Sequence, residues 1–336
     1  MKILVTGGLG YIGSHSVVEL IESGHEVVII DNLCNSKIEV LDIIEKLTGV
    51  RPQFYQFNLL IIEDLRKVFR EHTFDGVIHF AGLKAVAESI AKPLEYYENN
   101  ITGTLNLLKC MKENNLYNLV FSSSACVYGA PDENPIDESA DNNRATNPYG
   151  RTKFFIEEIL KDMYISDNNF RITVLRYFNP VGAHKSGLLG EDPNGIPNNL
   201  MPIMLKVAEG KSEVLKIFGN DYDTKDGTCV RDFIHVVDLA KGHVKAIERV
   251  IDNGIHFFNL GTGRGTSVME LVTSFNKVNG NLVKYQFAER RPGDVGEYYG
   301  SPKKANRELG WEATHTIDDM CKDSWKFIKT KNKKQD

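Results

Sequence analysis

Several features that mark other classes of protein are missing from this sequence. The five cysteines are scattered among 336 residues with no C-x-x-C pair, so we predict no metal site and interpret the thiols as reduced, in a cytoplasmic protein. No apolar run approaches the ~20 residues of a membrane span, and a strand predicted from residue 2 leads us to expect no signal peptide. The net charge of −5 favours neither nucleic acid nor a membrane surface as partner.

The amino-terminal region instead predicts a dinucleotide-binding βαβ unit. A short β-branched strand, Lys2–Thr6, leads into glycines spaced G-x-x-G-x-x-G, at Gly7, Gly10 and Gly13, and then into a helical pattern. Such glycines let backbone N–H groups approach a pyrophosphate at a helix N-terminus. The next strand, Glu26–Ile30, ends at Asp31. Asp31 would accept hydrogen bonds from ribose hydroxyls and repel a 2′-phosphate, which predicts NAD rather than NADP. The alternative is a solvated acid in a turn.

Strands and helical patterns then alternate. Helices are expected at 38–47, 62–72 and 94–114, and strands at 53–57, 76–80, 119–123 and 171–177. This alternation predicts an α/β fold with a doubly wound parallel sheet of Rossmann type. Ligands of such sheets bind at the carboxyl ends of the strands, where Asp31, Ala81 and Ser124 are expected. His79, within a strand, is interpreted as a packed core residue.

The pattern changes after Asn179-Pro180, where residues 183–199 are rich in Gly, Pro and Asn. A long irregular loop in a compact protein is usually functional. We therefore expect a NAD-binding domain over 1–180, a smaller mixed α/β domain for the substrate over 181–330, and a flexible tail over 331–336. A segment near 236–262 is a candidate to return to the first domain.

Tyr149 and Lys153 lie four residues apart on a predicted helix, and therefore on one face. A free tyrosine titrates near pH ~10, and a fixed ammonium beside it would lower that pKa and make it a base. Alone, this spacing usually marks a solvated helix face. With the dinucleotide fingerprint upstream and Ser124 at a strand end between them, it predicts a catalytic set of Tyr149, Lys153 and Ser124, although Ser124 could also simply cap its strand.

Together with Asp31–Ser36, His79–Val86, Leu175–His184, 195–202 and Val230–Asp232, these motifs resemble the extended short-chain dehydrogenase/reductase family, and within it the UDP-glucose 4-epimerases. The resemblance covers the chain except its tail. It implies an isomerase of galactose metabolism that interconverts UDP-galactose and UDP-glucose through a transient 4-keto sugar and enzyme-bound NADH. In that family the tyrosine takes the 4-hydroxyl proton, the serine aligns the hydroxyl, and the lysine holds the nicotinamide ribose and lowers the tyrosine pKa. The resemblance also suggests a homodimer formed through the helices near 94–114 and from Tyr149.

The resemblance implies further site residues. Besides the glycines, Asp31 and the catalytic set, the cofactor is expected to contact Tyr11, Ile12, Asn32, Asn35, Ser36, Asn58, Leu59, Phe80, Ala81, Gly82, Lys84, Asn99 and Phe178. Besides Lys84, Ser124 and Tyr149, the UDP-sugar is expected to contact Asn179, Asn199, Leu200, Phe218, Arg231, Arg291, Asp294 and Tyr298. Guanidinium groups suit a diphosphate, but Arg231 could instead form an ion pair with its neighbour Asp232.

Three positions depart from the family pattern: Asn58 replaces an aspartate expected at adenine, Cys126 a frequent threonine, and Cys229 a frequent glycine. We interpret Cys126 as tolerated packing and find no reason for Cys229 in the sequence.

Other functions remain open. A nucleotide-sugar 4,6-dehydratase needs an Asp-Glu pair after the serine, and here Ser124 is followed by Ala125-Cys126-Val127. An epimerase of N-acetylated UDP-sugars needs space beside the sugar's C2 substituent, and the bulky Tyr298 is expected to fill that space. The alternatives are that Tyr298 is only a core or surface aromatic, or that Tyr299 occupies this position instead. A non-catalytic NAD-sensing regulator would not need Tyr149, Lys153 and Ser124 together.

Overall fold

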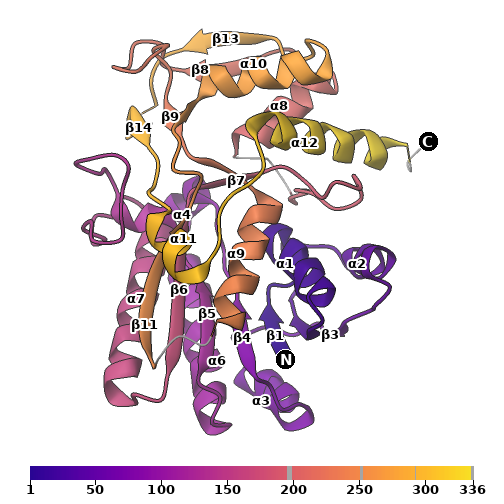
Figure 1. Ribbon diagram of the computed structural model, residues 1–336, viewed down its shortest axis with the longest axis vertical. Coiled ribbons are helices and arrows are strands. Elements are labelled where there is room, and N and C mark those ends of the chain that lie inside the picture. Colours follow the sequence, from indigo (N-terminus) through magenta and orange to yellow (C-terminus); the bar gives the residue numbers. More distant parts are fainter. Residues whose placement is uncertain (195–198, 250–252, 292, 334–336) are drawn as a thin grey trace.

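The computed structural model describes residues 1–194, 199–249, 253–291 and 293–333, and its largest element is a seven-stranded sheet beneath a smaller unit (Figure 1). All neighbouring strands of this sheet are parallel, in the order β11-β6-β5-β4-β1-β2-β3. The strands are β1 (Lys2–Thr6), β2 (Glu26–Ile30), β3 (Gln53–Tyr55), β4 (Gly76–His79), β5 (Asn118–Ser122), β6 (Arg171–Tyr177) and β11 (Gly254–Leu260). The predicted doubly wound α/β fold is confirmed.

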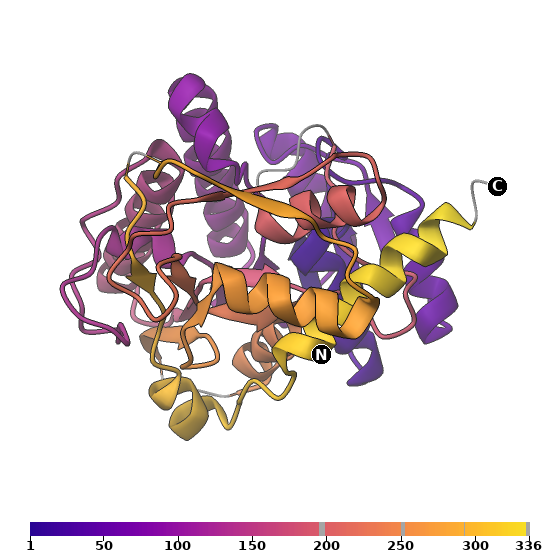
Figure 2. The same ribbon diagram turned by 90° about the horizontal axis from the view of Figure 1, so that it is seen from above.

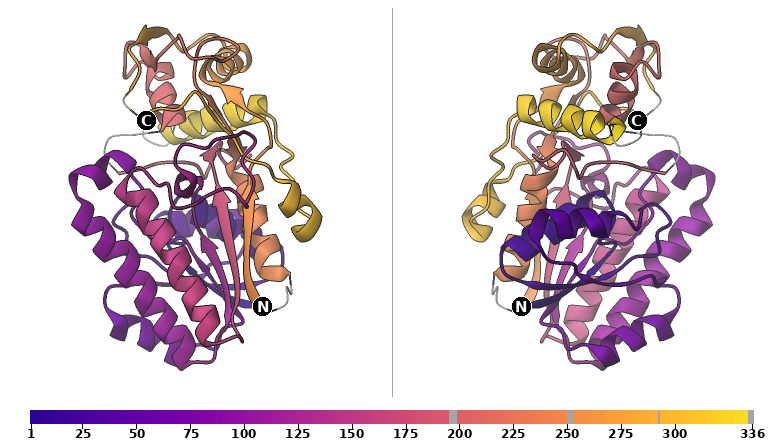
Figure 3. Two further views of the ribbon diagram at one scale, coloured as in Figure 1. Left: turned by 90° about the vertical axis from the view of Figure 1, so that its left-hand side faces the viewer. Right: turned by 90° about the vertical axis from the view of Figure 1, so that its right-hand side faces the viewer.

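Helices cover both faces of the sheet (Figure 3). One face carries α1 (Tyr11–Glu22), α2 (Val40–Thr48) and α9 (Val236–Glu248), and the other carries α3 (Ile62–Glu71), α6 (Gly103–Glu113) and α7 (Pro148–Ser166). Because side chains alternate along a strand, Ile3 and Val5 join the first core while Leu4 between them joins the second. A sheet buried on both faces explains the nearly continuous apolar strands of the sequence.

The chain is helical over nearly all of 94–114, as predicted, but a π-helical turn replaces part of the α-helix. The chain forms α4 (Val86–Ala91), α5 (Pro93–Tyr97), a π-helical turn η1 (Glu98–Thr102) and α6. Pro93 starts a new helix because proline suits a first turn but not an interior. In the π turn, the Asn100 side chain accepts from the Leu83 N–H at 2.8 Å and donates to Thr152 Oγ1 at 3.0 Å. This anchor ties the wide turn to the loop after β4, on the edge where ligands bind.

The smaller unit is built around its own core of apolar side chains. It contains α8 (Leu200–Ala208), α10 (Val268–Asn279) and α12 (Ile317–Asn332), seen from above in Figure 2, with paired strands β8 (Leu215–Phe218) and β13 (Tyr285–Ala288). Short strands β7 (Asn179–Val181) and β10 (Phe233–His235), and β9 (Val230–Arg231), β12 (Thr266–Ser267) and β14 (Glu297–Tyr298), connect the two units. Between them the chain passes back through α9 and β11, and α11 (Lys303–Leu309) packs on β11.

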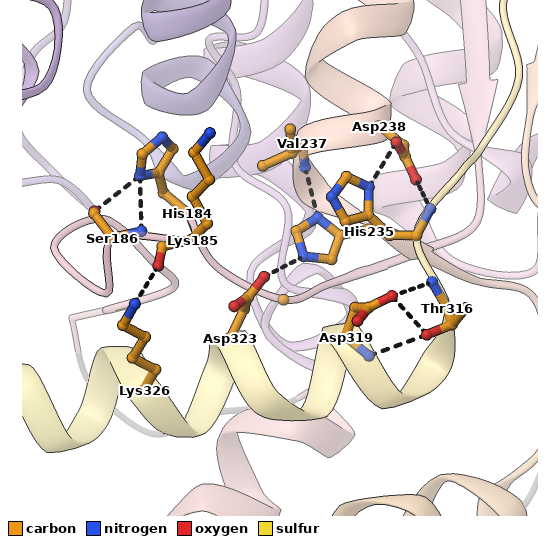
Figure 4. Close-up of polar contacts among 12 residues, drawn as sticks. His184, Lys185, Ser186, His235, Val237, Asp238, Thr316, Asp319, Asp323 and Lys326 are labelled. Atoms are coloured by element: carbon orange, nitrogen blue, oxygen red, sulfur yellow. Dashed lines mark hydrogen bonds and ion pairs between the residues drawn. The ribbon is translucent and has the colours of Figure 1, made fainter. Parts of the chain in front are cut away.

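Polar contacts fasten α12 to the larger unit (Figure 4). His235 accepts from the Val237 N–H at the start of α9, and its other ring nitrogen lies 3.3 Å from Asp323 of α12. Lys326 donates to the Lys185 carbonyl, and Thr316 begins α12 with a capping box that includes Asp319. Of these, the His235 contacts join α12 to the start of α9, whereas the Lys326 contact stays within the smaller unit and the capping box within α12 itself.

The prediction of a flexible tail from residue 331 is wrong for its first residues. Lys331 and Asn332 belong to α12, and Lys331 forms an ion pair with Asp192 at 2.7 Å. The side chain of Asn332 donates to Glu209. The helix therefore continues because its last turn finds partners on the smaller unit, which the lysine-rich sequence does not reveal. Residues 334–336 lie outside the described residues.

Candidate active site

A cavity of about 770 Å³ lies at the carboxyl ends of the sheet strands and extends under the smaller unit. Except for Tyr298, it is lined by every residue that the sequence assigned to the catalytic set, the cofactor or the UDP-sugar. Residues far apart in the sequence, such as Gly7 and Arg291, thus line the same cavity. Residues 195–198, which belong to one of the family motifs, lie outside the described residues.

The glycine turn forms a surface that only backbone atoms can make. A Cβ at Gly13 would lie 2.2 Å from the Gly7 carbonyl oxygen, and one at Gly7, where φ is +72°, would lie 2.7 Å from the Ala81 nitrogen. Gly10 is the N-cap of α1 and brings no side chain to its first amide groups. These N–H groups and the helix dipole favour an anion. The turn therefore fits the pyrophosphate of NAD.

Asp31 is 8% exposed and held in a fixed orientation. Its Oδ2 accepts from the Leu9 N–H at 3.1 Å, and its Oδ1 accepts from the Leu33 N–H at 2.9 Å and the Ser36 hydroxyl at 2.7 Å. The alternative of a solvated turn acid is therefore wrong. A fixed carboxylate on the cavity wall can accept from ribose hydroxyls and repels a 2′-phosphate. Asn58, which the resemblance places at adenine, uses its Oδ1 to accept from the Leu60 N–H at 3.0 Å.

The catalytic set meets at the ends of β5 and the start of α7. Asn147 caps α7 by accepting from the Gly150 N–H at 2.9 Å, which places Tyr149 in the first turn. Tyr149 and Lys153 are 8% and 6% exposed, so they do not form a solvated helix face. Ser124 accepts from the Cys126 N–H, and Lys153 donates to the Ser122 carbonyl at 2.8 Å.

Burial dominates the electrostatics of this corner. It raises the pKa of Tyr149 well above 10, with Tyr177 and Cys126 acting in the same direction and the Ser124 hydroxyl opposing them. Burial also lowers the pKa of Lys153 to about 8, partly offset by Glu157. The role predicted for Lys153, to lower the pKa of Tyr149, therefore has to act against the desolvation of the phenolate.

Two arginines converge on the substrate side. Arg231 and Arg291 lie 3.8 and 3.9 Å from the carboxylate of Asp294, and the Arg291 guanidinium lies 4.2 Å from the centre of the Phe218 ring. The alternative pairing of Arg231 with Asp232 is wrong, because Asp232 is fully buried and accepts from Thr262 instead. Two guanidinium groups around one distant carboxylate leave donors for a diphosphate.

Sequence reasoning missed Glu191 and Tyr177, which both line the cavity. Glu191 accepts from Lys84 at 3.3 Å and from Asn199 at 3.1 Å, so it links one predicted cofactor residue to one predicted substrate residue. The irregular composition of 183–199 was the available signal for Glu191. Cys126 and Cys229 also line the cavity.

Tyr298 lies just behind the cavity wall. Its hydroxyl donates to the Ala125 carbonyl, and its ring centre is 5.5 Å from that of Phe178, which does line the cavity. Tyr299 faces the other way, because a Cβ at Gly265 would lie 3.0 Å from its ring. Tyr298, rather than Tyr299, is therefore the tyrosine beside the catalytic corner.

Within the parts of the chain that the structure describes, no helix is long and apolar enough to cross a bilayer. In the same residues, no group of three or more His, Cys, Asp and Glu side chains could hold a metal ion.

Comparisons with known proteins agree with this geometry. Residues 4–324 match a family model described as GDP-mannose 4,6 dehydratase. UDP-glucose 4-epimerases of Bacillus subtilis and Homo sapiens are 56% and 51% identical to the chain, covering 97% and 98% of it and 96% of each relative. The crystal structure of UDP-glucose 4-epimerase from Bifidobacterium longum, in complex with NAD⁺ and UDP, superposes with a TM-score of 0.95 at 50% identity and 99% coverage of both chains. Another, from Stenotrophomonas maltophila with bound NAD and formylated UDP-arabinopyranose, gives 0.97 at 46% identity and the same coverage. Since the match extends over nearly the whole chain in both sequence and structure, this protein belongs to the UDP-glucose 4-epimerase family.

Proposed function

We propose that this protein is a NAD-dependent isomerase that interconverts UDP-galactose and UDP-glucose by inverting the sugar at C4. The observation that carries the proposal is the position of Tyr149, Lys153 and Ser124 in one corner of a single cavity. The glycine turn and Asp31 at one end of that cavity suit NAD, and Arg231 and Arg291 at the other end suit a diphosphate.

Each catalytic side chain has a task that its surroundings support. Tyr149 takes the proton of the sugar 4-hydroxyl and later returns it, and Ser124 aligns that hydroxyl. Lys153, held by the Ser122 carbonyl at 2.8 Å, supplies a nearby positive charge that favours the phenolate. NAD⁺, when bound, supplies the hydride acceptor and a further positive charge. Because burial raises the pKa of Tyr149, proton transfer depends on these charges acting together.

The dehydratase alternative is disfavoured at the same corner. Ser124 is followed by a short 3₁₀ helix, Ala125–Tyr128, whose sequence Ala-Cys-Val-Tyr contains no carboxylate. Elimination of water needs an acid/base pair there. A non-catalytic NAD sensor is disfavoured because, although Lys153 could serve NAD binding, burying the polar side chains of Tyr149 and Ser124 in the same corner is costly and serves no purpose in binding alone.

An incubation without added cofactor tests the function. UDP-galactose mixed with the purified protein is expected to give UDP-glucose, followed by NMR, with no net NADH, because copurified NAD returns the hydride to the sugar. Stoichiometric NADH would indicate a dehydrogenase, and loss of the C6 hydroxyl a dehydratase. A requirement for added NADP would contradict the role of Asp31.

The second prediction concerns sugar size. We expect wild type to refuse UDP-N-acetylglucosamine, because Tyr298 supports Phe178 on the cavity wall and a close-packed wall does not admit an added acetamide. Tyr298→Cys should admit it, because the smaller side chain frees space behind Phe178. Relative rates with the plain and the N-acetylated sugar measure this, and Tyr299→Cys is the matched control. Equal rates for both sugars in wild type would refute the assignment, as would refusal by Tyr298→Cys.

Several wider expectations are part of the proposal. We propose that the protein is a homodimer, supported by large apolar side chains left exposed on α4, α5 and α7: Val86, Ile90, Leu94, Phe155 and Ile165. A monomer in sedimentation velocity would contradict this.

We also propose a NAD-binding domain of 1–180 completed by the segment near 236–262, and a UDP-sugar domain over the remainder to 330. A cytoplasmic location is in keeping with five free cysteines.

A further inference from the structure

His243 is a buried histidine of α9 that does not line the cavity but reaches it through two hydrogen bonds. It is fully buried, and its Nε2 lies 3.2 Å from the Ser122 hydroxyl. The same hydroxyl lies 3.0 Å from the hydroxyl of Tyr177, which lines the cavity. Two consecutive hydrogen bonds therefore connect His243 on α9 with Ser122 at the end of β5, and Ser122 with Tyr177 at the end of β6.

The contact of His243 with the Leu239 carbonyl fixes which atom donates in each of these hydrogen bonds. His243 Nδ1 lies 2.9 Å from the Leu239 carbonyl oxygen, which can only accept. Burial lowers the pKa of His243 to about 4, so the ring is neutral and carries its one proton on Nδ1. Nε2 must then accept from the Ser122 O–H. Because that proton is used, the Ser122 oxygen must accept from the Tyr177 O–H.

The consequence appears at the cavity. With its proton directed back to Ser122, Tyr177 offers the cavity an oxygen that accepts and does not donate. Tyr177 and Tyr149 both line the cavity, and after burial Tyr177 is the side chain that most raises the pKa of Tyr149. A second donor there could hydrogen-bond the Tyr149 phenolate or the sugar 4-oxygen unproductively. Ser122 in addition fixes the carbonyl that holds Lys153.

We propose that His243 is a positioning residue of the epimerisation: acting through Ser122, it keeps the Tyr177 hydroxyl an acceptor toward the cavity and leaves proton transfer to Tyr149 alone. This inference rests on the proposed function. It assigns no contact with the substrate to His243, whose effect passes entirely through the Ser122 hydroxyl.

The test is a double-mutant cycle on the intact enzyme with UDP-galactose. His243→Leu, which frees the Tyr177 O–H to donate into the cavity, should lower kcat about tenfold, the scale of one misdirected hydrogen bond, with KM within about twofold. Tyr177→Phe removes that competing donor together with the acceptor and should lower kcat less than His243→Leu does. The double variant should be no slower than Tyr177→Phe, because residues acting along one path are not additive. His243→Gln, whose side-chain oxygen can accept from Ser122, should recover most of the rate.

Two further variants separate positioning from damage to the fold. Ser122→Ala removes the linking hydroxyl but keeps the carbonyl that holds Lys153. Because it also frees the Tyr177 O–H, it should show the same loss of about tenfold in kcat even if His243→Leu does not fold. Val244→Ala, the neighbouring buried position of α9, should leave kcat unchanged and combine additively with Tyr177→Phe. Multiplied effects of His243→Leu and Tyr177→Phe, a wild-type rate for Ser122→Ala, or no recovery in His243→Gln would overturn the proposal. An inactive wild-type protein would instead refute the proposed function.

Discussion

Tyr149→Phe is expected to lower epimerase turnover by about 10²–10⁴-fold, the usual contribution of a general acid/base. The hydroxyl that is removed is the group that takes and returns the sugar proton. The ring itself stays, and because Tyr149 is only 8% exposed, phenylalanine fills the same space. Binding of NAD and UDP-sugar should therefore survive, since the glycine turn, Asp31 and the two arginines are untouched.

The measurement is single-turnover kinetics together with the amount of NAD that copurifies. Tyr164→Phe, on the same helix but away from the cavity lining, is the matched control and should stay within about twofold of wild type. A Tyr149→Phe variant that turns over like wild type would remove Tyr149 from the mechanism. A variant that loses its NAD would show instead that the tyrosine is needed for binding.

Glu157→Ala is expected to cost about 3–5 kcal/mol in the free energy of unfolding, the scale for breaking a buried ion pair. Glu157 lies one turn beyond Lys153 on α7 and is fully buried against Arg176 of β6, at 2.6 Å. Its carboxylate also accepts from Ser123 at 2.6 Å and from Asn142 at 3.0 Å. Removing it leaves a buried guanidinium, whose pKa the carboxylate now raises, without a partner. The loss is larger than for any surface pair because water cannot replace the carboxylate.

Glu158→Ala offers a matched control one residue away. Glu158 pairs with Lys161 at 2.6 Å, with both side chains reached by water, so its removal should change stability by less than about 1 kcal/mol. Urea midpoints at an unchanged m-value compare the two variants. If Glu157→Ala unfolds at the same urea concentration as Glu158→Ala, the buried network does not hold α7 to the sheet. A double variant that also replaces Arg176 by Met should recover part of the loss, because the unpaired charge is gone.

Features that depend on neighbours along the chain were predictable from sequence. The glycine turn, the strands Lys2–Thr6 and Glu26–Ile30 and the helix predicted over 62–72 appear at the expected residues or end within one residue of them, since turns and periodic apolar faces are local properties. Tyr149 and Lys153 share a helix face for the same reason. The motif residues then meet in one cavity because parallel strands end at one edge of the sheet.

Only the tertiary structure decided the contacts and the burial that depend on segments far apart in the sequence. No local pattern indicates that Asn100 anchors a π turn, that Lys331 finds Asp192, or that Tyr298 lies behind Phe178. Local sequence also does not indicate that surrounding elements bury Tyr149 and thereby raise its pKa. His243 gains its place in the site only because α9 packs against β5. Burial and long-range hydrogen bonds depend on which surfaces the folded chain brings together, and a sequence read locally contains no record of those pairings.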